Sequence, residues 1–600
     1  MFSALALFRT PALLAGEGAD TLAALTKAND ENVQHQLAQP GRNTATGRPA
    51  GGWLMAMAAA YGDPHSSLHH DARLLPAMDR MLSGLERTQL EDGLYDVGNL
   101  DSPPDSAFIE ETMCKAQWCL VHDGDAATAA LRDRLKAVIV KAAGGIVVGG
   151  IHTPNHRWEV SSALADVNEL YPDQKYVARI EDWLGEGLDI DADGEWAERS
   201  PNYSSAVVDP SLLNIGLLLH KPELLEAVQK NLAMTIYHTE PDGEVETVAS
   251  RRQDQRPPTH KYIWEYYTFY RYFAIRDGNP AFAALARWIQ QNEMEDLTAN
   301  AADMNSALVW MLQIPDLQRD LPTAEPGLPA DYSKYFPLTA LGRMRHGALS
   351  ATIYGGSDRH AINTFDSGLA TNPAFFKVRK GRAILDAVRM TPTFFSTGHF
   401  YSEGLTHEGD LWHLQETRKV PYHLPLPASA RRPDGEYQLS PDGRYYSRLS
   451  FGERPSDYKT LTMAVDLKEA KGGFELTFDV SGYPHVPVTI ELTFRPGGKL
   501  EGVERIAAEA RDREAPGTVH HGRGEVMDSG NQREGYVLKQ GFGSYTVGSD
   551  RLEFGPGVYQ QAPGRMESEA ITWLNGNLRI EGEHVYLTGL TPFHHVLSFR

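Results

Sequence analysis

Long hydrophobic runs are missing from this chain of 600 residues, and no apolar stretch approaches the roughly 20 residues that a membrane-spanning helix needs. Several catalytic motifs are missing as well. The sequence contains no HExxH, no zinc cluster, no phosphate-binding loop, no dinucleotide-binding glycine run and no G-x-S-x-G elbow. These absences exclude several large enzyme classes, and they predict a protein with no membrane partner.

Cysteine is scarce, with only Cys114 and Cys119. They lie five residues apart in an apparent helix and face different directions, so we expect reduced core thiols. The first residues, "MFSALALFRTPALLAG", lack a basic segment before the apolar stretch, which Arg9 and Pro11 interrupt; this indicates a first helix or arm rather than a secretory signal. These features favour the cytoplasm. The periplasm or the exterior stays open for a chain from which a signal has been removed.

Positive charge is in deficit, because 57 Lys and Arg residues face 79 Asp and Glu residues, for a net charge of −22 at pH 7. A field of this sign argues against nucleic acid as a partner. If the ligand is itself an anion, local basic residues must hold it against the global field. Clustered arginines are therefore informative.

The hydrophobic pattern divides the chain into two regions. In residues 1–313 apolar residues recur at intervals of three and four, which predicts successive helical hairpins without a fixed sequence repeat, and hence an (α/α) toroid. Residues 314–337 are rich in proline and aperiodic, as in a linker. Residues 338–600 alternate with period two between glycine-rich turns, which predicts one large antiparallel β-sandwich or two stacked units. The predicted fold class is α+β multidomain, a toroid followed by a β-sandwich.

The stretch "HTPNHRWEV" has the features of a helix start. Thr153 is a good N-cap and Pro154 a good first residue, which would place Asn155 and His156 in the first turn. The free N–H groups there disfavour an imidazolium and attract a carboxylate, so a neutral histidine beside an amide suits an acidic sugar. The alternative is that both side chains only cap the helix.

A second stretch, "DADGEWAERSPNYSS", is too polar for a core helix and too rich in charge and aromatics for a plain linker. It carries Tyr203 four residues after Arg199, and "ASRRQDQR" carries Arg251 and Arg252 in another loop. Lowering a tyrosine pKa from about 10 toward 7 takes about 4 kcal/mol, which neighbouring guanidinium groups can supply. The alternatives are a half-buried packing tyrosine and a solvated arginine loop.

The turn "DIDADGEW" resembles the opening of a calcium-binding loop, because Asp189, Asp191 and Asp193 precede Gly194. The match fails at the twelfth position, where Ser200 replaces the expected glutamate. There are two interpretations: a structural calcium ion completed by other carboxylates, and an Asx-rich turn that caps two helices.

In the predicted β-region, "FFSTGHFYSEG" contains His399 and Tyr401. Aromatic residues at strand edges mostly pack against neighbours. These two could also reach the mouth of the toroid and contact a ligand there.

An Asn-His pair on a toroid helix, followed by a tyrosine and then a β-sandwich, resembles the heparinase II/III-like polysaccharide lyases. The stretches "NHRWE" and "ERSPNY" carry the resemblance, with Tyr203 following His156 by 203 − 156 = 47 residues. Within that superfamily the chain looks most similar to the rhamnosyl-glucuronate lyases of polysaccharide lyase family twenty-seven.

The resemblance implies β-elimination at a 4-O-linked uronate in an acidic oligo- or polysaccharide, with no cofactor required for the chemistry. Asn155, His156 and an arginine would stabilise the enolate-like intermediate, and His156 and Tyr203 would act as base and acid in either order. Substrate contacts would come from Arg199, Arg251, Arg252, Trp158, His399 and Tyr401.

Three other functions are compatible with the same residues. A toroidal glycoside hydrolase would need two carboxylates, for which Asp193, Glu195 and Glu198 are the candidates. A uronate epimerase would remove and return a proton at the same site. A glycan-binding protein without catalysis is the third.

Overall fold

The computed structural model describes most of the chain in ten stretches, and the segment 1–15 that we expected to form a first helix or arm lies outside them. The described residues are 16–38, 46–255, 260–323, 328–358, 368–395, 397–442, 446–470, 472–506, 535–563 and 581–600.

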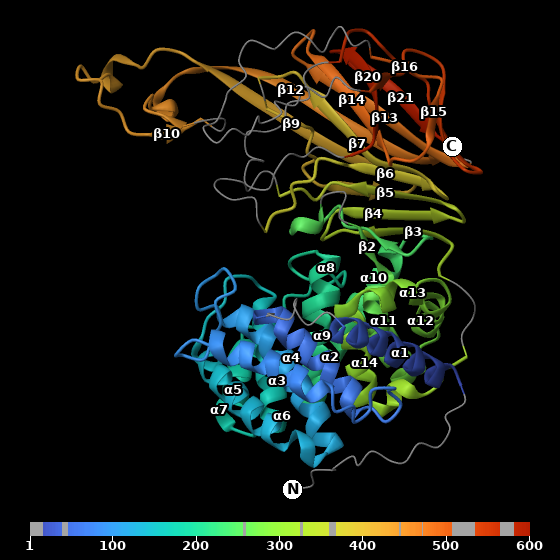
Figure 1. The fold of residues 1–600 in the computed structure, drawn as a ribbon. Coiled ribbons are helices and arrows are strands. Elements are labelled where there is room, and N and C mark those ends of the chain that lie inside the picture. The colour runs from blue at the N-terminus through green and yellow to red at the C-terminus, as the bar shows by residue number, and fades with distance from the viewer. Residues whose placement is uncertain are drawn as a thin grey trace. The chain divides into compact units, whose positions relative to one another are not determined.

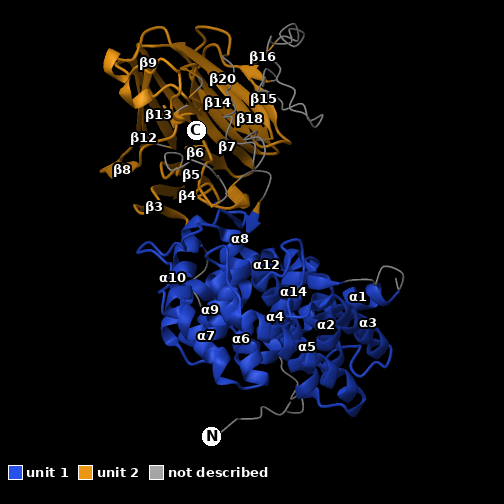
Figure 2. Ribbon diagram, turned by 90° about the vertical axis from the view of Figure 1, so that its left-hand side faces the viewer, with its two compact units in different colours: residues 1–246, 261–329 blue, residues 247–260, 330–600 orange. Residues whose placement is uncertain are grey.

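The chain forms two compact units (Figure 2). Unit 1 comprises Met1–Glu246 with Lys261–Pro329, and unit 2 comprises Thr247–His260 with Ala330–Arg600. The chain thus leaves the helical unit for 14 residues, a segment that the periodicity did not separate from the helices around it. The stretch 314–337, expected as a linker, contains the short helix Pro315–Gln318 and the strand Asp331–Phe336.

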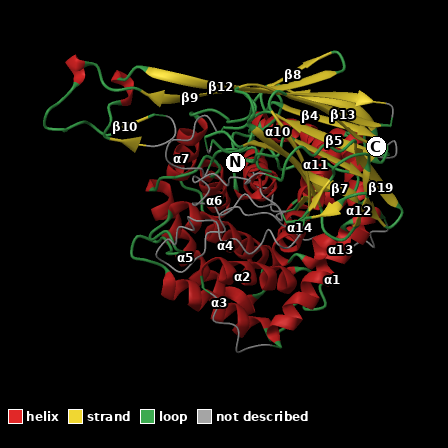
Figure 3. Ribbon diagram, turned by 90° about the horizontal axis from the view of Figure 1, so that it is seen from above, coloured by secondary structure: helices red, strands yellow, loops and turns green. Residues whose placement is uncertain are grey.

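Unit 1 is built from helices (Figures 1 and 3). Their bounds are α1 Glu17–Leu37, α2 Gly47–Gly62, α3 Leu74–Thr88, α4 Pro103–Asp123, α5 Ala129–Val148, α6 His156–Leu170, α7 Gln174–Leu184, α8 Pro201–Tyr203, α9 Asp209–Leu218, α10 Pro222–His238, α11 Tyr267–Asp277, α12 Pro280–Asn292, α13 Met294–Ala299 and α14 Ala301–Gln313, together with the small hairpin β1 Glu244–Val245 and β2 Lys261–Tyr262.

The helices of unit 1 pack in succession into a closed ring. Helix α2 packs on α4, α4 on α6 and α6 on α9, and the ring continues through α10 and α11 to α14. Helix α14 contacts both α1 and α2, so the last long helix of the unit closes on the first two. The toroid that the hydrophobic pattern predicted is confirmed.

Helix α4 shows how local sequence sets the helix ends. The Ser102 hydroxyl accepts a hydrogen bond from the Asp105 backbone N–H at 3.3 Å, Pro103 occupies the first turn, and Gly124 ends the helix in the left-handed region at φ 74°. Cys114 and Cys119 lie inside this helix as free, buried thiols, as predicted. Burial raises the pKa of the Cys119 thiol to about 12.

Strands β3 to β21 belong to unit 2. They are β3 Asp331–Phe336, β4 Leu341–His346, β5 Leu349–Tyr354, β6 Phe376–Lys380, β7 Ala383–Pro392, β8 Leu405–Glu408, β9 Leu411–His423, β10 Ser440–Pro441, β11 Tyr446–Ser447, β12 Ser456–Ala470, β13 Gly473–Gly482, β14 Pro487–Phe494, β15 Lys499–Glu501, β16 Glu504–Arg505, β17 Tyr536–Val537, β18 Gly543–Val547, β19 Asp550–Gly555, β20 Glu583–Leu590 and β21 Phe593–Phe599.

Two large sheets form one sandwich. One sheet has the order β15-β18-β19-β21-β13-β12-β9-β8 and the other β16-β17-β20-β14-β7-β6-β5-β4-β3. Among the named strands of the described residues, pairing in these two sheets is antiparallel apart from β17 with β20. Alternate residues of both sheets, among them Met463, Phe478, Ile490 and Leu587, join one apolar core. Of the two arrangements that the sequence left open, the structure has the single large sandwich.

None of the helices in the described part of the chain combines the length and the apolar character needed to cross a membrane.

Candidate active site

The stretch around Asn155 and His156 forms the start of α6, slightly later than expected. A tight turn covers Thr153 to Asn155, Asn155 takes the N-cap position, and the helix begins at His156. The Asn155 carbonyl accepts from the N–H groups of Trp158 and Glu159, but its side chain makes no capping bond. Asn155 therefore caps the helix through its backbone alone, and its side-chain amide is directed elsewhere.

That amide joins the two stretches that carried the resemblance. Asn155 Nδ2 donates to Glu198 Oε2 at 2.6 Å, and the two residues are only 1% and 7% exposed. His156 follows at 8% exposure, with the ring of His152 packed edge-on against it at 4.5 Å between centroids. The start of α6 thus lies against the segment that leads to Tyr203, all within unit 1.

The loop before Tyr203 starts as a tight hairpin. Ile190 pairs with Trp196, and Asp191 Oδ1 accepts from the backbone N–H groups of residues 193, 194 and 195 at 2.9, 3.0 and 2.9 Å. The Asx turn that the sequence left as one interpretation is thus present, but it closes this hairpin and does not cap two helices as expected. The Trp196 indole donates to Asp209 Oδ1 at 3.0 Å, which fixes the hairpin to α9.

Two uncommon backbone conformations flank Tyr203. Arg199 has φ 50°, in the left-handed region that costs a non-glycine residue about 1–2 kcal/mol. Residues Ser204–Val208 form a π-helix directly after α8. Strained residues and π-helical turns are frequent at functional sites, so this geometry agrees with a catalytic role for the loop.

Tyr203 itself is held through its backbone. Its N–H donates to the Ser200 hydroxyl at 3.2 Å, the N-cap of α8, while its ring is partly exposed. The buried Tyr266 hydroxyl donates to the Pro201 carbonyl at 2.8 Å. The loop is thereby fastened to the segment before α11, and the tyrosine ring is presented from a rigid support.

Trp158, expected to contact substrate, is fully buried. Its indole donates to Asp189 Oδ1 at 3.0 Å, and the guanidinium of Arg157 lies 4.5 Å from its ring centroid and 3.1 Å from the same carboxylate oxygen. Stacking on a sugar needs an open ring face, and the Trp158 indole has none, because it is fully buried and the Arg157 guanidinium covers it. The structure places Trp158 in the core, where it positions the acidic loop.

The three aspartates proposed for calcium are partly engaged already. Asp189 bonds Trp158, and one oxygen of Asp191 serves the Asx turn. Within the described residues the carboxylates of Asp189, Asp191 and Asp193 do not form a group of ligand atoms within 4.8 Å of one another. Calcium at this loop stays a prediction.

The arginine loop belongs to unit 2, whereas its place between helices led us to expect it on the toroid. Arg251 donates from Nε and an Nη to the two oxygens of Asp358 at 2.7 and 3.0 Å, a bidentate pair. The Gln255 side chain donates to the Leu369 carbonyl at 3.0 Å and accepts from the Thr371 N–H at 2.8 Å. These hydrogen bonds hold the segment 247–260 on unit 2. The guanidinium of Arg251 is used in the ion pair with Asp358.

His399 and Tyr401 are both 3% exposed inside unit 2. His399 shares a hydrogen bond with the Thr391 hydroxyl at 2.7 Å, and burial lowers the pKa of its ring to about 3, with Arg389 adding to the effect. The Tyr401 hydroxyl donates to the Thr371 carbonyl at 3.3 Å. Both residues pack in the core, the more common role for such aromatics.

A cavity of about 770 Å³ in unit 1 was missed by the sequence analysis. Tyr262, Trp264 and Trp288 line it together with Asp242 and Glu293. The run "KYIWEYY" carries two of these aromatics, but its helical period suggested core packing. Aromatic faces and hydrogen-bonding carboxyls suit a sugar ring.

Buried acids beside the α6 start were also missed. Glu159 and Asp166 of α6 and Glu110 of α4 are buried, and burial raises the pKa of all three carboxyls. The pKa of Asp166 rises to about 8. Their spacing on polar helix stripes resembles that of surface residues, so no sequence signal distinguished them.

No protein-family model matches the chain, and no curated protein matches its sequence. Solved structures match its fold. A chondroitin AC lyase of Streptomyces coelicolor A3, in complex with chondroitin sulphate, aligns with a TM-score of 0.55 at 14% identity, over 99% of this chain and 81% of that one. A Paenibacillus xanthan lyase aligns with a TM-score of 0.55 at 11% identity, over 98% of this chain and 57% of the xanthan lyase.

Heparinase III aligns with a TM-score of 0.51 at 11% identity, over 91% of this chain and 75% of that one. At such identities the likeness is one of fold. The expected fold class is confirmed: this chain has the toroid-plus-sandwich fold of these polysaccharide lyases.

Proposed function

We propose that this protein is a polysaccharide lyase that cleaves a 4-O-linked uronate glycoside by β-elimination. The hydrogen bond from Asn155 to Glu198 carries the proposal, because it joins the two short stretches on which the resemblance depends. The shared fold of the chondroitin, heparin and xanthan lyases supports it.

The chemistry removes the C5 proton of the uronate, forms the C4=C5 double bond and breaks the C4–O4 bond. The C5 proton is weakly acidic while the neighbouring carboxylate is charged. The amide of Asn155 and the ring of His156 donate hydrogen bonds to that carboxylate and stabilise the charge that develops on it. Asn155 has a second amide proton for this purpose, since Glu198 accepts only one.

His156 and Tyr203 form the acid–base pair. One removes the C5 proton, and the other protonates O4 of the departing sugar, which leaves with a new hydroxyl group. Arg199, four residues before Tyr203, lies in the same rigid loop and supplies positive charge for the substrate carboxylate or the phenolate.

The proposed substrate is glucuronate capped by α-1,4-linked L-rhamnose, and the support for this choice is the resemblance to the rhamnosyl-glucuronate lyases. The cavity lined by Tyr262, Trp264 and Trp288 offers apolar faces for a sugar. Tyr262 and Trp264 of this cavity are followed in the chain by Glu265 and Tyr266. Glu265 accepts a hydrogen bond from the Ser205 hydroxyl, and the Tyr266 hydroxyl donates to the Pro201 carbonyl, so both contact the loop around Tyr203.

A single assay tests the reaction class. Purified protein is mixed with uronate polysaccharides and with rhamnose-capped glucuronate, and ultraviolet absorbance is followed, because only elimination leaves a double bond conjugated to a carboxylate. Rising absorbance supports the lyase. New reducing ends without absorbance would indicate a hydrolase, an inverted C5 centre would indicate an epimerase, and binding without product would indicate a glycan-binding protein.

The variant Glu198→Gln tests whether Glu198 acts as a catalytic acid or base, as it would in a hydrolase, or only accepts a hydrogen bond from Asn155, as in the proposed lyase. A hydrolase that uses Glu198 as acid or base would lose roughly 10²-fold or more in kcat, because an amide cannot exchange the proton. In the lyase the side-chain carbonyl of the introduced glutamine still accepts from Asn155, so we expect a loss below about tenfold. Glu195→Gln in the same loop is the matched variant.

A further inference from the structure

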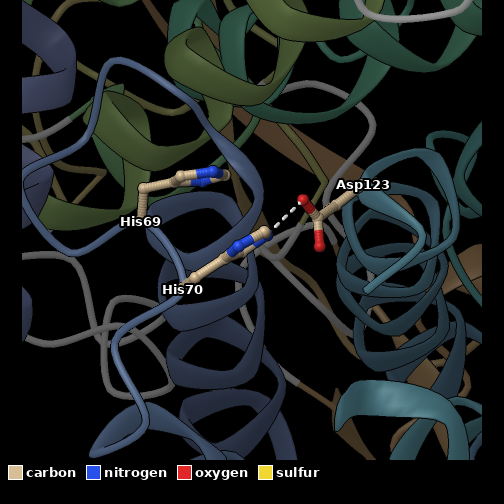
Figure 4. A group of neighbouring side chains, drawn as sticks. All are labelled: His69, His70 and Asp123. Carbon is tan, nitrogen blue, oxygen red and sulfur yellow. Dashed lines mark hydrogen bonds and ion pairs between the residues drawn. The ribbon is translucent and has the colours of Figure 1, made fainter. Parts of the chain in front are cut away.

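Two histidines and an aspartate meet at one end of the α2–α4 helix pair, outside the site described above. His69 and His70 lie in the loop between α2 and α3, and Asp123 is the last residue of α4 (Figure 4). Each residue offers one ligand atom, and these atoms all lie within 4.8 Å of one another. Imidazole nitrogen and carboxylate oxygen are the donors that zinc prefers.

The close approach of the two helices brings the loop to Asp123. Gly62 ends α2, and a Cβ at this position would lie 3.1 Å from the Cys119 carbonyl oxygen and 3.4 Å from Asp123 Cβ. Glycine therefore allows the end of α2 to lie directly on α4. His70 then adopts φ 53°, which turns the chain back toward Asp123.

The hydrogen bonds of His69 determine its tautomer. Its Nδ1 lies 3.0 Å from the Tyr61 carbonyl oxygen, which can only accept, so Nδ1 carries the proton. Nε2 is then left with a lone pair. Histidine ligands of metal ions are oriented in the same way, with the second ring nitrogen donating to a carbonyl or carboxylate.

His70 and Asp123 are already spaced nearly as zinc ligands. His70 Nε2 lies 2.8 Å from Asp123 Oδ1, and the rings of His69 and His70 stack with 3.8 Å between centroids. In a tetrahedral site with zinc bonds of about 2.0–2.2 Å, two ligand atoms lie about 3.3–3.6 Å apart. A small rotation of the His69 and His70 rings that moves their nitrogens away from Asp123 would therefore make room for the ion. The Asp123 side chain is 5% exposed, and its other oxygen accepts from the Asp125 N–H at 3.3 Å, which holds the carboxylate in place.

The surroundings are negatively charged. Asp125 accepts from the Tyr61 hydroxyl at 2.5 Å, and the Tyr61 ring lies 5.2 Å from that of His70 between centroids. Asp123 and Asp125 place two carboxylates at this end of α4, where Asp123 Oδ2 accepts from the Asp125 N–H. A cation at the cluster is favoured by the same field.

We propose that His69, His70 and Asp123 bind a divalent transition-metal ion, zinc in the first place, with water as the fourth ligand. The ion replaces the direct pair between His70 and Asp123 and links the loop after α2 to the end of α4. Its role is to stabilise this edge of the helical ring, since the ligands belong to different helical hairpins.

The test uses the full chain after treatment with EDTA and dialysis. Zinc chloride is titrated by calorimetry at pH 7.5, and melting curves are recorded with and without one equivalent. We expect one zinc ion per chain and a higher melting temperature. Calcium and magnesium should give no such response at this cluster, because they prefer oxygen ligands. Cobalt in place of zinc should show the visible absorption of a tetrahedral ion.

Variants locate the ion. His69→Ala and Asp123→Asn should each weaken zinc binding at least tenfold, while His65→Ala, in the same loop but outside the cluster, should leave it within about twofold. Melting of the metal-free variants shows whether they are folded. The proposal is overturned if wild-type protein binds no zinc, or if His69→Ala and Asp123→Asn bind it as wild type does.

Discussion

Tyr203 combines a fixed backbone with a partly exposed ring, the combination expected of a group that must meet a substrate atom precisely. Neighbouring tyrosines differ from it. Tyr266 and Tyr270 are buried, and their hydroxyls donate to the carbonyls of Pro201 and Leu232 at 2.8 Å in each case. Their roles are structural, whereas the role we propose for Tyr203 is chemical.

Replacing Tyr203 by Phe removes only the hydroxyl. We expect kcat to fall by at least about 10²-fold, the usual contribution of general acid–base catalysis. The free energy of unfolding should change by no more than about 1.5 kcal/mol, the value of one hydrogen bond. Steady-state kinetics and urea unfolding check both numbers, with Tyr458→Phe, a residue 58% exposed in β12, as the control. A variant that keeps more than a tenth of wild-type kcat would contradict the role.

Asp191 is the residue on which the loop turn depends, because one of its oxygens accepts three backbone N–H groups. Asp191→Ala leaves these donors without their acceptor and should lower the free energy of unfolding by about 1–3 kcal/mol. The same variant tests calcium. If the ion binds, calcium added to the EDTA-treated protein raises the melting temperature of the wild type but not of Asp191→Ala. A melting curve of the wild type that calcium leaves unchanged would show that the aspartates serve the turn alone.

The part of the site that is local in sequence could be predicted, and the part set by packing could not. Asn155, His156 and Tyr203 were proposed from residue types in short stretches, and their catalytic roles stay predictions. The Asx turn was one of two interpretations of "DIDADG". The burial of Trp158 accompanies a hydrogen bond to Asp189, 31 residues along the chain, that no local pattern reveals. The bidentate pair of Arg251 with Asp358, 107 residues later, is of the same kind.

Long helices and strands could also be predicted, because their patterns are local in sequence. The three-and-four periodicity of the helices and the alternation of the strands repeat over many residues, so single exceptions do not hide them. Short elements were not. The π-helix Ser204–Val208 covers little more than one turn, and the segment Thr247–His260 joins unit 2 through its contacts rather than through any period.

Helices α4 and α6 pair through a polar stripe that carries Glu110, Glu159 and Asp166, all buried. Asn214 donates to Asp166 Oδ1 at 2.8 Å, and burial, with the charge of Glu111 adding to it, raises the Asp166 pKa to about 8. In the unfolded chain an aspartate titrates near 3.9. Between about pH 4 and pH 8 the folded protein therefore binds a proton that the unfolded chain releases.

The sign of the pH dependence follows from this proton. The free energy of unfolding should fall as the pH rises from about 4 to about 8, by at most about 1.4 kcal/mol per pH unit for Asp166, and level off above. Asp166→Asn keeps the acceptor for Asn214 and removes the titration, so its stability should vary less between pH 6 and pH 8 in urea unfolding. Asp434→Asn, an exposed control, should behave as wild type. An unaltered slope in Asp166→Asn would show that other groups carry the proton.

The molecule as a whole carries a net charge of −22, yet the proposed substrate is an acid. Its long-range field slows the approach of a polyanion, and added salt screens this repulsion over a Debye length of about 8–10 Å. Capture must then depend on short-range contacts with a fixed geometry. Among the arginines of the sequence analysis, Arg251 has a structural task, because its fork is bidentate to Asp358.

We predict that Arg252 binds the uronate carboxylate. Arg252→Lys keeps the charge but loses the planar fork, so kcat/KM should fall at least about tenfold, or about 1.4 kcal/mol of transition-state stabilisation. Because the lost contact is short-range, the ratio of wild type to variant should stay constant when the salt concentration is raised, even as both rates change with screening. Arg251→Lys should instead lower the stability of unit 2 through its pair with Asp358 and leave kcat/KM within about threefold. If kcat/KM of Arg252→Lys lies within about twofold of wild type, the prediction for Arg252 is wrong. Arg199, which lies in the same loop as Tyr203, would then be the candidate for binding the uronate carboxylate.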